Sequence, residues 1–372
     1  MPVASLEVAP PRTELSRIGG LLNIPPALYT PGREIPVFFT IQAADGSGPC
    51  RFFLNRAQRR YLFNRTYRDV VLKARQMGFR SIILGDNLMR ALKVGNVNMV
   101  IAAQREALAM VKLRQVKLWL DELLSKGWPI VYGVCTAKEI ELLHPINVGI
   151  WIESADGEGA GRGRTINILH NTESAYWLGD AAAKVAGLIG SMPAAPWSLV
   201  TDESTPQGAA GRFCKQYTDA KAKKNGSTPH FFPWWWDDSR RIAPVPHLFE
   251  RHLGEEERWL VETHNLDLEQ LYWRRVKMAE LGDFFPQEFP EDDRTCFLSS
   301  GRAVFRLPIV RRLEQRQAEP LPIADLEDKD LKALATNLKG ALRVWKEPMV
   351  GGKYVIAADT AQVAGFDISD GK

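Results

Sequence analysis

The chain has 372 residues, of which 45% are hydrophobic and 25% charged, and its formal net charge is +4. This length suits two domains or one large domain with an appendage, and so small a positive charge does not by itself require a nucleic-acid partner. Four cysteines without C-x-x-C spacing and only six histidines argue against a zinc site or a disulfide framework. Without a secretory leader or a bilayer-spanning apolar run, we expect a soluble intracellular protein with no membrane partner.

The first part of the chain changes character near residue 50. Residues 1–50 are rich in proline and glycine with weak periodicity, and we expect an arm or extended lead-in there. Residues 51–70 then alternate arginines with aromatic residues. This pattern is typical of an amphipathic helix with a solvated basic face, although it would also allow local contact with nucleic acid.

From residue 51 to about residue 245, strand patterns alternate with helical ones. We expect strands at 69–72, 98–103, 147–154, 165–170 and 197–204, and helices at 81–94, 105–126 and 179–191. Such alternation predicts an α/β fold with a mostly parallel sheet and helices on both faces. Ligands of these sheets bind beyond the carboxyl ends of the strands, so the residues that follow the strands are the candidates for chemistry.

After residue 245 the pattern becomes helical, notably over 255–282, and a proline-rich acidic connection follows. We therefore divide the chain into an arm (1–50), an α/β core (51–245), a helical lid or linker region (246–345) and the start of a further domain (346–372). The last segment opens a new strand without partners, and an isolated strand is not stable, so we expect the chain to stop just inside that domain.

The first candidate site is the loop KARQMGFRS at 73–81, which joins a strand to a helix. A phosphate cradle needs backbone amides at a helix N-terminus, a small residue, a cation and a hydroxyl for magnesium. Gly78 supplies the close approach, Ser81 a displaced hydroxyl, and Lys73, Arg75 or Arg80 the charge. An ordinary basic turn explains this loop about as well.

Two further candidate sites follow later strands. Glu173 follows the strand at 165–170, where a carboxylate can polarise an attacking water; alternatively, Thr172 caps a helix and Glu173 lies in its first turn. Glu203, Ser204 and Thr205 stand at the end of the strand at 197–204 and could sense a phosphate, or could form an ordinary capped turn. Taken together, a basic loop, a carboxylate and a Ser/Thr segment stand in the functional order of P-loop ATPase motors.

These motifs resemble those of the large terminase subunit of tailed bacteriophages, a DNA-packaging motor. The resemblance runs from about residue 50 to residue 372 and is carried by KARQMGF, RGRT, LHNTESAYW, ESTPQG, WRRVKMAELG, FPQEFPEDDRTCFLSSGRAVF and YVIAADTA. It implies a P-loop NTPase-type ATPase domain, then a helical lid or linker, then the first strand of a truncated nuclease domain of RNase H-like fold.

The resemblance also implies roles for individual residues. Glu173 would be the catalytic carboxylate, Arg162 the arginine supplied to a neighbouring subunit's nucleotide, and Asp359 the first metal ligand of the nuclease. The coupling motif would comprise Glu203, Ser204 and Thr205. The ATP site would comprise Gln58, which would contact adenine, and Lys73, Arg75, Gln76, Gly78, Arg80 and Ser81 of a deviant Walker A loop.

The sequence departs from the family pattern at two positions. Arg80 stands where relatives carry the magnesium hydroxyl, which leaves Ser81 one position late as the Mg²⁺ ligand, and Thr172 stands where the Walker B aspartate is expected. The cation that holds the phosphates is also open: we favour Lys73 at the start of the loop, while Arg80 with Ser81 is the alternative register. The replacements at positions 80 and 172 both weaken the expectation of strong ATPase activity.

The resemblance implies an ATP- and Mg²⁺-dependent motor that translocates double-stranded DNA into a capsid. It implies a homo-oligomeric ring acting with a portal protein and a small terminase subunit, in the cytoplasm of the infected bacterial host and transiently at the portal vertex. Two alternatives stay open: a helicase-like ATPase, or a DNA-binding assembly subunit with a decayed nucleotide site. We expect no nuclease activity from these residues, because two-metal cleavage needs several converging carboxylates and the chain offers Asp359 and then only Asp367 or Asp370.

Overall fold

The computed structural model describes residues 31, 35–43, 46–144, 147–155, 163–195, 198–209, 211–300 and 321–327, and positions 329, 332, 333, 336 and 344. The chain divides into two compact units, residues 1–304 and 305–372. In the second unit the described part includes one short 3-10 helix, Ile323–Asp325. The expected nuclease strand and Asp359 lie outside the described residues. The sheet and the helices that cover it belong to the first unit.

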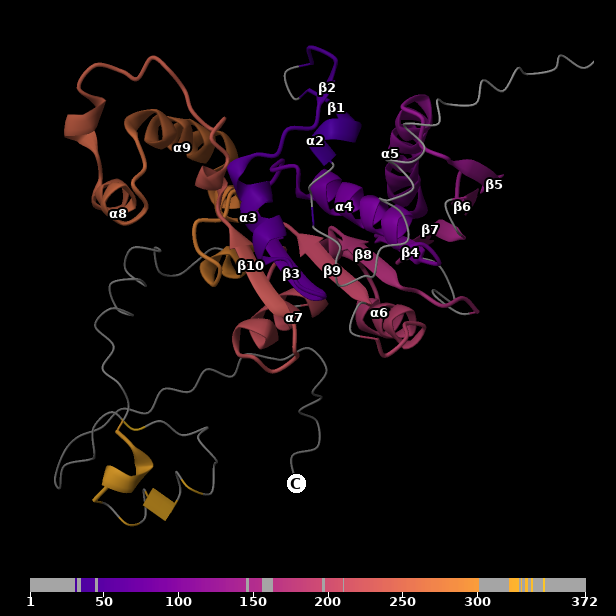
Figure 1. Ribbon diagram of the computed structural model, residues 1–372. Coiled ribbons are helices and arrows are strands. Elements are labelled where there is room, and N and C mark those ends of the chain that lie inside the picture. The colour runs from indigo at the N-terminus through magenta and orange to yellow at the C-terminus, as the bar shows by residue number, and fades with distance from the viewer. Residues whose placement is uncertain are drawn as a thin grey trace, which may run out of the picture. The chain divides into compact units, whose positions relative to one another are not determined.

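The first unit is built on an eight-stranded sheet in the order β10-β3-β9-β8-β4-β7-β6-β5, shown in Figure 1. The strands from β10 to β7 pair in parallel, whereas β5 and β6 are antiparallel at one edge. This confirms the α/β fold with a mostly parallel sheet. The strands are β3 (Arg68–Lys73), β4 (Asn98–Ala103), β5 (Val131–Cys135), β6 (Glu139–His144), β7 (Val148–Ser154), β8 (Ile168–Thr172), β9 (Leu199–Ser204) and β10 (Thr228–Phe232).

Alternate residues of the central strands point to opposite faces, as the pleat of a strand requires. On β4, Met99 and Ile101 join the largest core cluster, whereas Val100 and Ala102 join a second cluster on the other face. Because both faces are apolar, the strand reads as a continuous hydrophobic run, which is typical of a parallel sheet covered on both sides.

Helices cover both faces of the sheet, as Figure 1 shows. The side chains of α4 (Phe79–Val94) and α5 (Glu106–Ser125) belong to the largest cluster, on one face. On the other face, α6 (Ala181–Gly190) packs in the second cluster and α7 (Arg212–Lys221) in a third cluster with β3. The helix α3 (Arg56–Asn64) precedes β3, and its buried side chains also belong to the largest cluster.

The segment before residue 50 contributes to this core where the structure describes it. A short helix α2 (Ile35–Phe38) leads to β1 (Thr40–Gln42), which pairs with β2 (Pro49–Arg51). Ile35 and Phe39 are buried in the largest cluster, and the Phe39 ring stacks on Trp119 of α5. Part of the expected arm therefore packs against the α/β core.

The expected helical stretch over 255–282 is helical, and the chain forms two helices there. Helix α8 (Glu255–His264) ends at Asn265, whose φ of 54° is left-handed, and α9 (Leu268–Leu281) starts after Asp267. Asp267 accepts a hydrogen bond from the Gln270 amide, and the Gln270 side chain accepts one from the Asp267 amide. Such a capping box is a strong start signal, and it allows the chain to turn between the helices.

Two expected strands begin later than the sequence pattern indicated. The strand expected at 165–170 is β8, Ile168–Thr172, and the strand expected at 197–204 is β9, Leu199–Ser204. Because β8 also ends later than expected, Thr172 is a strand residue, and it pairs with Glu203 on the adjacent parallel strand. No helix among the described residues is both long enough and apolar enough to cross a membrane.

Candidate functional site

The basic loop joins the carboxyl end of β3 to the N-terminus of α4. Gly78, the residue before the helix, has a φ of 70°, and Gln76 has a φ of 58°. A Cβ atom at position 78 would lie 2.4 Å from Nε2 of Gln58, so glycine is required here both for its conformation and for its size. The loop thus places the first turn of a long helix, with its unsatisfied backbone amides, at the carboxyl ends of the parallel strands.

Gln58 supports this loop from α3. Its side-chain Nε2 donates to the backbone oxygens of Met77 and Gly78, at 3.3 and 3.1 Å, and its Oε1 accepts from the Asn55 amide. The side chain is buried and ties the start of α3 to the loop. The adenine contact that the family resemblance implies for Gln58 stays a prediction.

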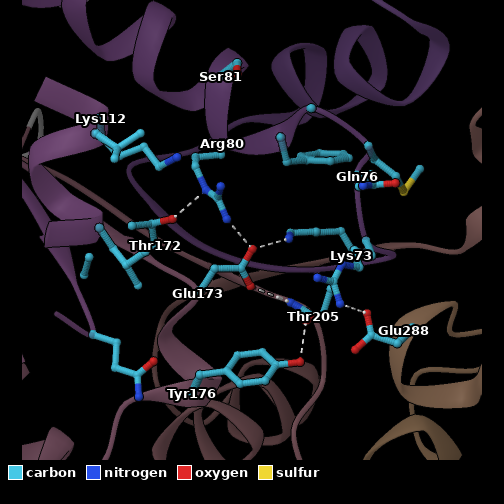
Figure 2. Close-up of a pocket in the computed structure, with 18 residues that line it drawn as sticks. Lys73, Gln76, Arg80, Ser81, Lys112, Thr172, Glu173, Tyr176, Thr205 and Glu288 are labelled. Atoms are coloured by element: carbon cyan, nitrogen blue, oxygen red, sulfur yellow. Dashed lines mark hydrogen bonds and ion pairs between the residues drawn. The ribbon is translucent and has the colours of Figure 1, made fainter. Parts of the chain in front are cut away.

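Glu173 lies beside the loop, directly after β8. Its Oε1 accepts from Lys73 Nζ at 2.9 Å and from Arg80 Nη2 at 2.7 Å, as Figure 2 shows. Its Oε2 lies 3.5 Å from both the Ser204 hydroxyl and the Thr205 amide. The three sites proposed from the sequence are thus in contact, with this carboxylate at their centre.

The alternative in which Thr172 caps a helix is wrong. Glu173 adopts a left-handed φ of 49° and is followed only by a 3-10 turn, Ser174–Tyr176, without a side-chain cap. The Thr172 hydroxyl instead donates to Glu203 Oε1 at 2.5 Å and accepts from Arg80 Nε at 3.2 Å. The left-handed backbone of Glu173 is a conformation that non-glycine residues adopt rarely and often at functional sites.

Glu203 is fully buried behind these residues. Its Oε2 lies 3.4 Å from Lys73 Nζ, and its Oε1 lies 3.8 Å from Nε2 of the buried His170. Burial opposes the charged carboxylate, but the charge of the neighbouring Lys73 outweighs it, so the pKa of Glu203 falls below its usual range. Glu203 is in β9, near its end, and its carboxylate faces Lys73.

Two buried basic groups, Lys73 and His170, lie near Glu203, and they differ in charge. Burial alone would lower the pKa of Lys73, but the carboxylates of Glu203 and Glu173 overcome this effect and raise it. Burial lowers the pKa of His170, so this imidazole is neutral at physiological pH. Lys73 therefore stays charged at the carboxyl end of β3.

The segment after α9 adds a further wall. Glu288, at the end of helix α10 (Phe285–Glu288), pairs with Arg75 Nη1 at 2.7 Å. The hydroxyl of Tyr176 lies 3.0 Å from that of Thr205, and Gln287 Nε2 lies 3.4 Å from the Tyr176 hydroxyl. Sequence reasoning missed Tyr176, Gln287 and Glu288, since nothing in their local pattern indicates that this segment reaches the strand ends.

These residues surround a cavity of about 680 Å³. Helix α5 forms one wall with Leu108, Val111 and Lys112. Lys112 was also missed, because a lysine in the middle of a long helix reads as part of a solvated face. Ser81 lines the cavity as well, but in Figure 2 it lies beyond Arg80, away from the Glu173 carboxylate. The cavity is lined by Lys73, Arg75, Gln76, Met77, Gly78, Phe79, Arg80, Ser81, Ala103, Gln104, Leu108, Val111, Lys112, Thr172, Glu173, Tyr176, Thr205 and Glu288.

For two expected site residues the structure gives no position relative to this cavity. Arg162 lies outside the described residues, as Asp359 does. Among the residues that the structure does describe, no group of three or more His, Cys, Asp or Glu side chains is arranged to hold a metal ion. The geometry thus brings together the basic loop, Glu173 and the 203–205 segment, while the other implied roles stay predictions.

No protein-family model and no curated protein matches the sequence. Among solved structures, the large terminase ATPase domain of Thermus phage P74-26 is similar with a TM-score of 0.44 and 12% identity, over 63% of this chain and 91% of that one. The large terminase of bacteriophage HK97 has a TM-score of 0.46 and 17% identity, over 71% of this chain and 55% of that one. The Phi-28 gp11 DNA packaging motor has a TM-score of 0.35 and 10% identity, over 64% and 69%. The first two structures are large terminases, and the third is a DNA packaging motor.

Proposed function

We propose that this chain is an ATP-hydrolysing subunit of a motor that translocates double-stranded DNA into a viral capsid, as large terminases do. The observation that carries the proposal is the convergence of Lys73, Arg80 and Glu173 beside the N-terminus of α4. Two cations, a helix N-terminus and one carboxylate at the carboxyl ends of parallel strands form the arrangement that phosphoryl transfer from a nucleotide requires.

The ion pairs suggest how the site works. Lys73 and Arg80 share one oxygen of Glu173. When these cations bind phosphate oxygens instead, the carboxylate is released and can accept a proton from, and orient, an attacking water. The backbone amides of the loop at 76–80 add donors that stabilise the charge developing on the transferred phosphoryl group.

Magnesium would take most of its ligands from phosphates and water, so the chain needs to supply only one or two oxygens. The Ser81 hydroxyl lines the cavity and suits this role, whereas the Thr172 hydroxyl is already bonded to Glu203 and Arg80. We therefore assign the protein ligand of Mg²⁺ to Ser81. The ion would neutralise phosphate charge alongside Lys73 and Arg80.

Coupling to movement would run through the end of β9. Ser204 and Thr205 contact Oε2 of Glu173, and Thr205 contacts Tyr176, which in turn contacts Gln287 near α10. Release of Glu173 from Lys73 and Arg80 would therefore be transmitted to a segment outside the sheet. We propose that this displacement moves duplex DNA, which is gripped through its phosphates without sequence readout.

The remaining roles follow from the sequence resemblance. Arg162 would act on a neighbouring subunit's nucleotide in a homo-oligomeric ring. That ring would work with a portal protein and a small terminase subunit at the procapsid, in the cytoplasm of the infected host. Asp359 would belong to the nuclease domain.

The test is steady-state ATP hydrolysis with and without double-stranded DNA, for the unaltered chain and for Glu173→Gln. Gln keeps the shape of Glu173 but cannot accept the proton, so we expect the rate to fall by about 10² to 10⁴-fold. Nucleotide affinity should be unchanged or stronger, because the carboxylate no longer competes with phosphate for Lys73 and Arg80. We expect DNA to stimulate the unaltered chain.

The matched control is Glu262→Gln, which removes an exposed carboxylate on α8 and should hydrolyse ATP at the unaltered rate. Nucleotide binding without turnover by the unaltered chain would contradict the proposal. That result would favour a DNA-binding assembly subunit with a decayed site, which the arginine at position 80 and the threonine at position 172 would then explain.

A further inference from the structure

The cations that line the cavity differ in how they are neutralised. Lys73 pairs with Glu173 and Glu203, Arg80 pairs with Glu173, and Arg75 pairs with Glu288. No hydrogen bond or ion pair joins Lys112 to any residue of the described part of the chain. Lys112 is therefore a cation of the cavity that forms no ion pair with a described residue.

The position of Lys112 is not that of an ordinary surface lysine. It is half-buried on α5, and in Figure 2 its ammonium group points across the cavity toward Arg80 and Thr172. Lys117, one and a half turns further along the same helix, is exposed and does not line the cavity. Two adjacent cations attract an anion, and while Glu173 and Glu203 both lie within 4 Å of the Arg80 guanidinium, no carboxylate of the described residues forms an ion pair with Lys112.

We propose that Lys112 is a phosphate-binding residue of the nucleotide site, holding the same anionic group that Arg80 binds. The inference rests on the proposed function, since it takes the ligand of the cavity to be a nucleoside polyphosphate. It adds to the loop and to Glu173 a residue on a different element, α5, which no sequence motif identifies. Through Lys112, helix α5 would contact the bound nucleotide directly.

The charge of Lys112 should depend on the ligand. Burial and the neighbouring Arg80 lower the pKa of Lys112 to about 8, against the opposing charges of Glu203 and Glu173, with Lys73 adding a further lowering effect. An anion beside the ammonium raises its pKa. Below pH 8 the free protein already carries this proton, whereas above pH 8 it must take one up on binding, so affinity for an anion falls as pH rises.

The experiment measures the dissociation constant of a fluorescent, non-hydrolysable ATP analogue with Mg²⁺ at pH 7.5 and pH 9. For the unaltered chain we expect affinity to fall roughly eightfold between these values, because one proton is taken up above a pKa of about 8. For Lys112→Met we expect affinity at pH 7.5 to be roughly tenfold weaker, the effect of one lost charge-assisted hydrogen bond, and to be nearly independent of pH. Lys112→Arg, which stays charged, should bind tightly at both pH values.

The control is Lys117→Met, which should reproduce the affinity and pH dependence of the unaltered chain; circular dichroism checks that each variant is folded. If Lys112→Met keeps the unaltered dissociation constant and its fall with pH, the inference is wrong and nucleotide binding stands. If the unaltered chain binds no analogue at either pH, the proposed function fails, and the inference fails with it.

Discussion

At the scale of single residues, the site depends on the buried carboxylate of Glu203, whose contact with Lys73 could not be read from the sequence. Glu203 is fully buried and Lys73 is 5% exposed, so each would be costly to bury alone. Their contact at 3.4 Å, with Glu173 on the other side of the ammonium, keeps Lys73 charged and in place. The carboxylate that balances Lys73 at the end of β3 therefore comes from β9, the strand that pairs with both β3 and β8.

We expect Glu203→Gln to lower the free energy of unfolding by about 3 kcal/mol, because it leaves a buried ammonium with one carboxylate partner. The control is Glu288→Gln, which breaks a pair whose arginine side chain is 62% exposed and should cost less than about 1 kcal/mol. Urea unfolding of both variants at pH 7 measures the difference. Equal losses would contradict the assignment of Glu203 as the counter-charge of Lys73.

The pH dependence of stability follows from the direction of these shifts. The pKa of Glu203 is lowered in the folded protein, so its contribution is present above the unfolded pKa of about 4 and is lost as pH falls through the folded value. The pKa of Lys73 is raised, so its contribution is present below the unfolded value of about 10 and is lost only above it. We expect the unaltered chain to lose stability below about pH 5, and Glu203→Gln to lose less there.

At the scale of elements, the basic loop between β3 and α4 is held by the packing of α3 against the start of α4. Gln58 caps α3 and at the same time bonds the backbone of Met77 and Gly78. The loop conformation is therefore fixed before any ligand binds. Preorganised backbone donors of this kind lower the cost of holding a phosphate.

Gly78→Ala should disrupt this arrangement. The new Cβ would lie 2.4 Å from Gln58 Nε2 and would sit on a residue with a φ of 70°, so Gln58 must move and the backbone is strained. We expect a loss of about 2 kcal/mol in the free energy of unfolding, and at least tenfold weaker binding of the ATP analogue. The control is Gly190→Ala at the end of α6, where no atom lies within 4 Å of the added Cβ and stability should be unchanged or slightly higher. Unaltered affinity in Gly78→Ala would mean that the loop is an ordinary basic turn.

The elements also show which parts of the fold could be predicted from the sequence. The buried strands β3, β4 and β7 and the long helix α5 were predictable, since a continuous apolar run or a long helical period identifies them. Strands β5 and β6 were not, because they lie at the edge and carry exposed and polar residues, and β10 begins with Thr228 and Pro229. The place of the candidate site, including Glu203, was predictable from strand-terminal residues, whereas the contact of Glu203 with Lys73 and the presence of Lys112 and Glu288 required the registers and packing that only the fold supplies.

At the scale of the whole molecule, the site is assembled from distant parts of one core. The largest cluster joins Phe39 of the first described segment, the helices α4 and α5, and Trp234, Trp273 and Phe285 from the later part of the first unit. The chain after β10 is therefore packed into the same core as the sheet, and α10, which carries Glu288, is held at the strand ends by that packing. The tryptophans at 234 and 235 are buried, so they pack in the core and do not offer a stacking surface to bases.

This assembly predicts that a chain ending at residue 304 folds and binds nucleotide. The sheet, the residues of the three hydrophobic clusters and all the residues that line the cavity come from the first unit, residues 1–304. We expect this shortened chain to keep the thermal midpoint of the longer one within a few degrees and to bind the ATP analogue with the same affinity and the same fall between pH 7.5 and pH 9. A chain ending at residue 245 is the control: it lacks Trp273, Phe285 and Phe289, whose burial is worth about 2 kcal/mol or more each, and should unfold at a much lower temperature. If the chain ending at residue 304 were unfolded or lost its affinity, residues beyond 304 would have to complete the nucleotide site.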